Sequence, residues 1–356
     1  MALHNPATGV LDDAELKAAL YGGLVNEDVM QRIADISPVE TPFRDSIGQG
    51  ERATNSRKGW TEKALAAPDK TNALIDGQNM LGVASNAAAY GQRVSNLCQI
   101  FGKLIQLSTR GQTVDSIGSI GRIVTQLADR QNENYRDIEA VMLSEQASVA
   151  DNGTNVAGKL GAYFAWVVTN ASAGATGANG GFNTTTGLVD APTPGTTRPL
   201  SETLVRQISD STYLSGGNPT MMMTIVALAT AFSNYLFTSS ARVATLQSDT
   251  GQKKAPLVAQ GAVNVFVSNH GVTLNIVGNR IMQPEVATPG SERCNVAIYD
   301  PELASESILR GMRTEPLAKS GLSDNWQVTC DETLIVNPEN GHGAIRDIDY
   351  TAAVIA

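Results

Sequence analysis

The sequence predicts an α+β fold, in which helices and strands occupy largely separate parts of the chain. A long amphipathic pattern over about residues 114–147 indicates one helix much longer than usual. Short β-prone segments cluster late in the chain, at 261–280, 295–300 and 326–348. Residues 48–95 are polar and broken by glycine, and they contain too few apolar side chains to build a core of their own.

The bulk composition limits the class of protein. A length of 356 residues indicates two domains, or one domain with large excursions. The net charge of −9 and the pI of about 4.9 argue against a broad nucleic-acid-binding surface, because an acidic chain repels phosphates. Such a chain is still compatible with enclosing nucleic acid without gripping it.

The cysteines and the N-terminal segment indicate a reducing compartment. Cys98, Cys294 and Cys330 are odd in number and far apart, so we expect reduced and partly buried thiols. The first residues, MALHNPATGVLDD, lack the basic and apolar regions of a signal peptide. No run approaches the roughly 20 apolar residues that span a bilayer. We therefore expect a protein that is made in the cytosol and has no membrane partner.

The first third of the chain reads as an arm followed by an excursion. We expect short helical pieces at Asp12–Tyr21 and Glu27–Ile36, with Phe43 and Ile47 as apolar anchors behind them. Residues 48–95 have a mild β character that favours a long two-stranded excursion. Because such a hairpin is marginal alone in water, either it is disordered or something outside its domain holds it.

The long helix is preceded by an apolar run, NLCQIFGKLIQLSTR, which fits a buried strand. A cap at Thr113 or Asp115 would begin the helix, and at about 1.5 Å per residue it would be about 50 Å long. Gln131 and Asn134 interrupt its apolar stripe, so we expect weaker contact there. The stripe consists of Ile117, Ile120, Val124, Leu127, Ile138 and Val141.

The remaining segments alternate between helix and strand patterns. We expect KLGAYFAWVVTN to be β-prone, and the run from SAGATGANGG to Pro199 to form a flexible surface loop. LSETLVRQISDSTYL predicts a helix that Ser201 caps and that ends before Gly216-Gly217. MMMTIVALATAFSNYLF predicts a strand followed by a buried helix.

One stretch resembles a phosphate-binding loop. In GTNVAGKL, Gly153, Gly158 and Lys159 have the P-loop spacing, but Leu160 stands where a Ser or Thr would hold magnesium. A P-loop follows a strand and opens a helix, whereas this segment follows a helix and precedes β-prone residues. We interpret it as a turn at Gly153. An NTPase remains the alternative from a different functional class.

The sequence predicts no catalytic, cofactor-binding or metal-binding residues. His4, His270 and His342 are too scattered for a metal site or a proton relay. Asp347 and Asp349 would share one face of a strand, which we interpret as solvated. We therefore expect a protein that is not an enzyme and needs no cofactor.

Several segments follow one another in a recognisable order. ETPF, Gly59-Trp60, RVSNLCQIFGKLIQLS and YRDIEAVMLSEQA come first, and YFAWVVTN, LSETLVRQISDSTYLSGGNPT and LAKSGLSDNWQVTCDETLIVNPENGHGAIRDI come later. In this order they resemble the major capsid protein family of tailed bacteriophages, over roughly residues 40–350.

The resemblance implies a domain plan in four parts. The tailed-phage major capsid fold would have an N-terminal arm, an extended β-hairpin loop, a peripheral domain with a long spine helix, and an axial domain. In this sequence these parts would cover 1–45 for the arm, 46–100 for the loop, 101–159 and 323–344 for the peripheral domain with its spine helix at about 114–147, and 160–322 and 345–356 for the axial domain.

The resemblance also implies a function. The protein would be a structural major capsid protein that self-assembles into hexamers and pentamers, forming an icosahedral shell around packaged double-stranded DNA that it does not bind sequence-specifically. Further candidate partners are a separate scaffolding protein, a portal and decoration proteins. The protein would be located in the virion after assembly in the host cytoplasm. The shell of a bacterial protein-enclosing nanocompartment is the alternative with the same fold.

Within this family interpretation, the loop is expected to clasp a neighbouring subunit. Trp60 is the expected anchor, because a large aromatic side chain in a polar loop suits docking into a partner's surface. Some relatives join subunits covalently through a lysine. Lys58, Lys63 and Lys70 match no such site, so crosslinking is not expected.

Overall fold

The computed structural model describes most of the chain. The described residues are 39–65, 67–77, 79, 91–113, 123–238, 265–268, 271–286, 292–319 and 321–355. The expected helical pieces of the arm and the first part of the expected long helix, 114–122, lie outside the described residues. Among the helices that the structure describes, none combines the length and the apolar character needed to cross a bilayer.

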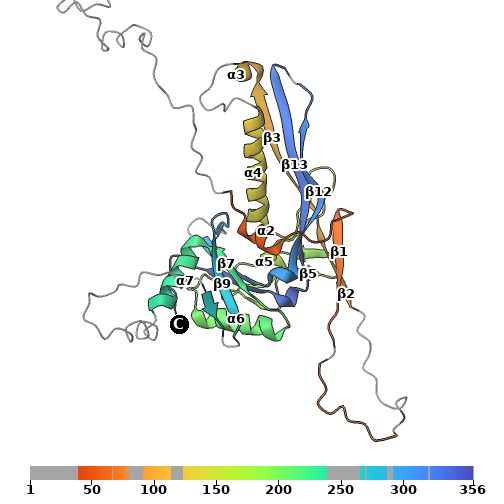
Figure 1. Ribbon diagram of the computed structural model, residues 1–356, viewed down its shortest axis with the longest axis vertical. Coiled ribbons are helices and arrows are strands. Elements are labelled where there is room, and N and C mark those ends of the chain that lie inside the picture. Colours follow the sequence, from red (N-terminus) through yellow and green to blue (C-terminus); the bar gives the residue numbers. More distant parts are fainter. Residues whose placement is uncertain are drawn as a thin grey trace, which may run out of the picture.

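The elongated upper part in Figure 1 is an antiparallel sheet with one helix beside it. Its strands are β3 (Gln99–Ser108), β12 (Ala304–Pro316) and β13 (Ser323–Val336), in the order β12-β13-β3. We call it the long sheet. Helix α4 (Ile123–Met142) packs along β3 and β13, and the short helix α3 (Thr109–Thr113) follows β3.

The strand β3 is half-buried, so the expectation of a buried strand is wrong. Phe101 and Ile105 are buried on the side of α4, where Lys103 also forms an ion pair with Asp137 of that helix. Side chains alternate across a strand. The intervening Ile100 and Leu104 therefore point the other way and are 58% and 60% exposed.

The long helix also differs from its expected form. In the described residues it ends at Met142, before the expected end at Ala147. Val124 is 77% exposed, whereas Ile138 is fully buried. Asn134, expected to weaken the contact, is fully buried, and its Nδ2 donates a hydrogen bond to the carbonyl of Val328 at 3.3 Å. Because the side-chain amide of Asn134 is hydrogen-bonded, the helix stays packed against the sheet where its apolar stripe is interrupted.

The lower part in Figure 1 is a mixed sheet covered by two helices. Its strand order is β4-β14-β11-β7-β9-β8, with β10 paired to β11; β7/β9 and β14/β4 are parallel pairs. Helix α6 (Glu202–Leu214) packs on β14, and α7 (Val226–Thr238) packs on β7 and β9. The strands are β4 (Ala171–Ser172), β7 (Met221–Ile225), β8 (Val265–Val267), β9 (Thr273–Asn279), β10 (Glu285–Val286), β11 (Glu292–Tyr299) and β14 (Gly343–Ile348).

Short elements join the two parts. They are helix α2 (Pro42–Ile47), helix α5 (Tyr163–Trp166), the pair β5 (Gly181–Asn183) and β6 (Leu188–Asp190), and the 3-10 turns η3 (Pro301–Leu303) and η4 (Glu339–Gly341). The expected β-prone segment around Tyr163 is therefore a buried helical turn. The Tyr163 hydroxyl donates towards the carbonyls of Gly343, at 3.0 Å, and Ile298, at 3.2 Å. This turn is thus held against β14 and β11.

The strand β12 belongs to the long sheet. Residues 304–316, which are expected in the axial domain, pair with β13 from Ala304↔Val336 to Pro316↔Trp326. The two strands are joined by a short connection, and their hydrogen bonds make β12 part of the long sheet. The strand and helix expected at 221–237 are confirmed as β7 and α7.

Candidate functional site

The excursion expected near residues 48–95 begins and ends as a two-stranded hairpin. Strand β1 (Arg57–Glu62) pairs antiparallel with β2 (Gln92–Leu97), from Arg57↔Leu97 to Glu62↔Gln92. We call residues 57–97 the hairpin. Its described residues 67–77 lie below the ends of β1 and β2, away from both sheets (Figure 1). Leu65 is 87% exposed and Leu74 48% exposed.

Asn96 fixes the root of the hairpin to the rest of the subunit. Its side chain is buried, and its Nδ2 donates hydrogen bonds to the carbonyls of Gly161 and Leu334, each at 2.9 Å. Its Oδ1 accepts a hydrogen bond from the N–H of Gly161 at 2.7 Å. Both donor hydrogens and the acceptor of the amide are therefore used. The root of the hairpin belongs to the core of its own subunit.

Trp60 contacts its own subunit, a contact that the sequence did not predict. The half-buried indole lies against Trp166, which in turn stacks on Phe182 with 5.7 Å between ring centroids. The Nε1–H of Trp60 donates a hydrogen bond to Glu62 at 3.0 Å. The indole of Trp60 therefore packs against an aromatic cluster formed by α5 and β5. The polar residues around Trp60 in the sequence did not predict this contact.

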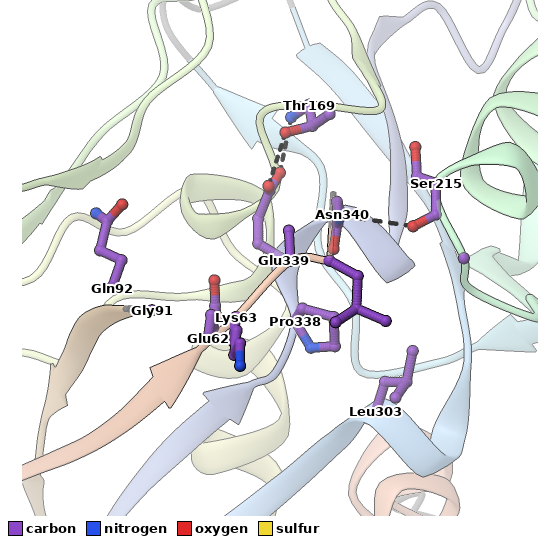
Figure 2. Close-up of a pocket in the computed structure, with 13 residues that line it drawn as sticks. Glu62, Lys63, Gly91, Gln92, Thr169, Ser215, Leu303, Pro338, Glu339 and Asn340 are labelled. Atoms are coloured by element: carbon purple, nitrogen blue, oxygen red, sulfur yellow. Dashed lines mark hydrogen bonds between the residues drawn. The ribbon is translucent and has the colours of Figure 1, made fainter. Parts of the chain in front are cut away.

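A cleft of about 770 Å³ opens where the hairpin leaves the body of the protein (Figure 2). Glu62, Lys63, Gly91 and Gln92 line it from the hairpin side. The opposite wall is held by Glu339. Its Oε1 accepts hydrogen bonds from the N–H groups of Val168 and Thr169, and its Oε2 accepts one from the Thr169 hydroxyl at 2.8 Å. The other lining residues are Ala64, Leu65, Thr169, Ser215, Gly216, Leu303, Pro338 and Asn340.

The cleft contains two neighbouring carboxylates, Glu62 and Glu339. Burial raises the pKa of Glu62, and the nearby charge of Glu339 adds to this effect. None of the lining residues is a histidine or a cysteine, and the Thr169 hydroxyl is engaged as a donor to Glu339. Glu339 is likewise engaged, as the acceptor of the hydrogen bonds from Val168 and Thr169. The cleft is a seam between the hairpin and the lower sheet.

Helix α2 is anchored by a carboxylate from α4. Glu139 is fully buried, and it accepts hydrogen bonds from the N–H groups of Phe43 at 2.8 Å and Arg44 at 2.9 Å. Asn279, at the end of β9, donates a third at 2.7 Å. Burial raises the pKa of Glu139, and these hydrogen bonds oppose that shift. One carboxylate thus joins α2, α4 and the lower sheet.

Arg44 connects the same helix to the long sheet. Its guanidinium donates two hydrogen bonds to Glu306 of β12, at 2.6 and 2.7 Å, and lies 3.5 Å from Glu332 of β13. It also lies 4.7 Å from the ring centre of Tyr135 on α4. Both sheets and the long helix therefore meet at α2. The sequence did not predict this meeting point, because its charged residues are single residues in widely separated segments.

Asp347 is buried, so its expected position on a solvated strand face is wrong. It forms an ion pair with Arg293 at 3.2 Å, and Arg293 also forms an ion pair with Glu145. Oδ2 of Asp347 accepts a hydrogen bond from the N–H of Gly174 at 2.9 Å. Asp347 has a φ of 61°, which breaks the alternation that the strand pattern assumed.

The glycine-rich run after Ser172 is closely packed, contrary to the flexible loop expected. A Cβ atom at Gly174 would come within 2.0 Å of the Thr196 carbonyl oxygen, and one at Gly180 within 2.0 Å of that of Asp190. Arg346 of β14 donates a hydrogen bond to the carbonyl of Ala178 at 3.1 Å. Here glycine permits a close backbone approach, and the run is part of the fold.

The GTNVAGKL stretch has the geometry of a polar turn. Gly153 has a φ of 69°, as expected for the turn, and its N–H donates to Asp151 at 2.6 Å. Oδ1 of Asn152 accepts hydrogen bonds from the N–H groups of the three residues after Gly153. The N–H groups from Gly153 to Val156 are therefore already used within the turn. Lys159 continues into a bridge with Val149, where a P-loop would begin a helix.

The histidines and cysteines singled out in the sequence do not come together in a site among the described residues. His342 is fully buried against Tyr163, with Nε2 at 3.3 Å from the Leu303 carbonyl, and burial lowers its pKa to about 4. His4 and His270 lie outside the described residues. Cys98 is half-buried, and Cys294 and Cys330 are buried, as expected. In the part of the chain that the structure describes, His, Cys, Asp and Glu form no group able to hold a metal ion.

Comparisons with known proteins point to phage capsids. The family described as SU10 major capsid protein matches residues 12–349. The chain is 24% identical over 331 residues to the major capsid protein of Escherichia phage Phieco32, which covers 85% of this chain and 88% of the relative.

Solved structures share the fold at low sequence identity. The capsid of a native GTA particle has a TM-score of 0.56 and 13% identity, covering 94% of this chain and 99% of that one. A chain from Mycobacterium phage Ogopogo has a TM-score of 0.53 and 11% identity, covering 91% and 97%. A chain from Mycobacterium phage Adephagia has a TM-score of 0.52 and 11% identity, covering 96% and 98%. These likenesses confirm the α+β fold expected from the sequence.

Proposed function

Since the chain belongs to the SU10 major capsid protein family and is a subunit of a phage capsid shell, we propose that it assembles into hexamers and pentamers. These close into an icosahedral shell around packaged double-stranded DNA. The protein acts through its shape and surfaces, and it is not an enzyme. Its partners are other copies of itself, with a scaffolding protein, a portal and decoration proteins as further partners in the host cytoplasm and in the virion.

The observation that carries this proposal is the contrast between the two ends of the hairpin. Its root is buried through Asn96 and Trp60. Its outer part carries the exposed apolar side chains of Leu65 and Leu74 and lies away from both sheets. Apolar side chains in such a position are covered when another copy of the chain packs against them. The outer part of the hairpin therefore lies across a neighbouring subunit.

The domain plan supports the same assembly. We propose an arm at 1–45, the loop at 46–100, a peripheral domain around the long sheet and an axial domain around the lower sheet. Because β12 pairs with β13, it belongs to the peripheral domain in this plan. The net charge of −9 lets DNA pack against the inner wall without sequence-specific binding.

Limited proteolysis of subunits and shells tests the proposal. Electron microscopy of the expressed full-length chain should show closed shells. Trypsin should cut after Lys63 and Lys70 readily in free subunits and at least tenfold more slowly in shells, because a neighbour covers these sites. A Leu74→Ser variant should keep the stability of the subunit and lower the yield of shells. Equal cleavage rates in both states would contradict the clasp.

A further inference from the structure

A buried group of three charged side chains ties α2 to the root of the long sheet. Arg44 comes from α2, Glu306 from β12 and Glu332 from β13. The side chains of both carboxylates are 2% exposed, and that of Arg44 is 16% exposed. Side chains from elements far apart in the sequence therefore meet at this point.

The charges in this group do not balance when both carboxylates are ionised. The fork of Arg44 is committed to Glu306, with contacts of 2.6 and 2.7 Å, whereas its distance to Glu332 is 3.5 Å. Two buried carboxylates against one guanidinium would leave an uncompensated negative charge, which is costly in a buried site. One proton shared between the two carboxylates removes that charge.

The neighbouring groups do not supply the missing positive charge. Asp331, next to Glu332 on β13, adds a further carboxylate, which lies 3.6 Å from Arg310 of β12. Tyr135 of α4 lies against the guanidinium of Arg44, and Cys330 of β13 carries a thiol. On α2 itself, the remaining charged side chain is Asp45, which is acidic. Glu139 of α4, which accepts hydrogen bonds from the N–H groups at the start of α2, is a further acid.

The protonation of Glu332 follows from these surroundings. Burial is the main cause that raises its pKa to about 9, and the hydrogen bond and charge of Glu306 add to the shift. Burial also raises the pKa of Asp331, which Arg310 opposes. The pair of carboxylates therefore keeps one proton at neutral pH.

We propose that Arg44, Glu306 and Glu332 form a proton-dependent latch, in which one proton shared by the two carboxylates keeps α2 docked on the long sheet. Loss of this proton creates repulsion between β12 and β13 at the point where Arg44 binds, and the docking of α2 weakens. The folded chain holds a proton that the unfolded chain releases, so stability falls as pH rises from about 5 to about 9. The latch is a device within one subunit and does not depend on how subunits assemble.

Urea unfolding of the purified full-length chain between pH 6 and pH 9 tests the latch with three proteins. Glu332→Gln keeps the shape of the side chain and can still donate a hydrogen bond to Glu306, but it cannot lose a proton. The unfolding constant of the wild type, divided by that of Glu332→Gln, should rise by up to about tenfold per pH unit. Glu315→Gln, at an exposed position of the same strand β12, should follow the wild type. A ratio that stays constant within about twofold over this range would overturn the latch.

Hydrogen exchange of the wild type gives a second test that needs no variant. The N–H groups of Asp45 and Gly48 are hydrogen-bonded to the carbonyls of Thr41 and Arg44 in docked α2. After correction for the intrinsic rate, protection in a peptide covering 41–50 should fall by at least about tenfold from pH 6 to pH 9, more than in peptides from α6. Equal pH dependence in both peptides would overturn the proposal.

Discussion

The indole ring of Trp60 lies against that of Trp166, with 5.2 Å between ring centroids and 35° between ring planes. Trp60 is on β1 of the hairpin, and Trp166 is on the buried turn α5. The contact therefore sets the position of the hairpin within its own subunit before any neighbour is present.

Replacing Trp60 by Ala should destabilise the free subunit. A fully buried Trp→Ala change costs about 3–5 kcal/mol. Because Trp60 is half-buried, we expect a loss of about 1.5–3 kcal/mol in the free energy of unfolding. Leu65→Ala, at a side chain that is 87% exposed, should stay within about 0.5 kcal/mol of the wild type. Urea unfolding of free subunits measures both. A loss of stability in assembled shells but not in free subunits would indicate that Trp60 anchors the contact between subunits.

Replacing Asn96 by Ala should detach the root of the hairpin. The change leaves the N–H and carbonyl of Gly161 and the carbonyl of Leu334 without their partners from this side chain. Each buried polar group left unsatisfied costs about 1–3 kcal/mol, so with three such groups we expect a total loss of about 3 kcal/mol or more. Asn55→Ala, at an exposed position, is the matched control. Hydrogen exchange in β2 should rise in Asn96→Ala alone, and unchanged exchange there would show that β1 and the aromatic contacts suffice.

Two apolar positions of α4 should differ sharply. Ile138→Ala removes a fully buried side chain and should cost about 2–5 kcal/mol. Val124→Ala alters a side chain that is 77% exposed, so its effect should stay within about 0.5 kcal/mol. Thermal unfolding of both variants measures the contrast. Equal losses would mean that both positions lie on one buried apolar stripe, as the sequence pattern indicated.

These positions show how far the sequence alone could predict the fold. The elements α6, β7 and α7 follow from local patterns: the helices from burial at helical spacing, and β7 from a short continuous apolar run. Asn134 and Glu139 could not be predicted in this way. A polar residue in a helical pattern is expected to face solvent, whereas their partners, Val328 and Phe43, lie 194 and 96 residues away in the sequence.

The same limit applies to the glycine-rich run and to the latch. Glycine is common both in mobile loops and where backbones approach closely, and only the position of Thr196 against Gly174 distinguishes the two. For Glu306 and Glu332, the register between β12 and β13 brings the two acids together. That register depends on long-range strand pairing, which composition and spacing do not specify.

His342 should make the protein sensitive to acid. Burial lowers its pKa to about 4 from 6.5, so the unfolded chain binds a proton in this range that the folded chain excludes. The resulting stability is complete above about pH 6.5 and is lost as pH falls towards 4, by about 3 kcal/mol in total. Buried acids with a raised pKa, such as Glu332, act in the opposite direction, so the wild-type curve alone does not isolate the effect.

The comparison with His342→Gln isolates it, because Gln does not titrate and can donate a hydrogen bond to the Leu303 carbonyl. The difference in free energy of unfolding between the wild type and His342→Gln, measured at pH 7 to 8, gives the cost of the substitution itself. Between pH 7 and pH 4 this difference should shift by about 3 kcal/mol in favour of the variant, since only the wild type must keep a neutral imidazole buried. Both proteins contain the same carboxylates, so the contributions of these groups to the pH dependence cancel in the difference. A difference that does not change with pH would mean that the buried imidazole becomes protonated without opening the contact between η4 and Leu303.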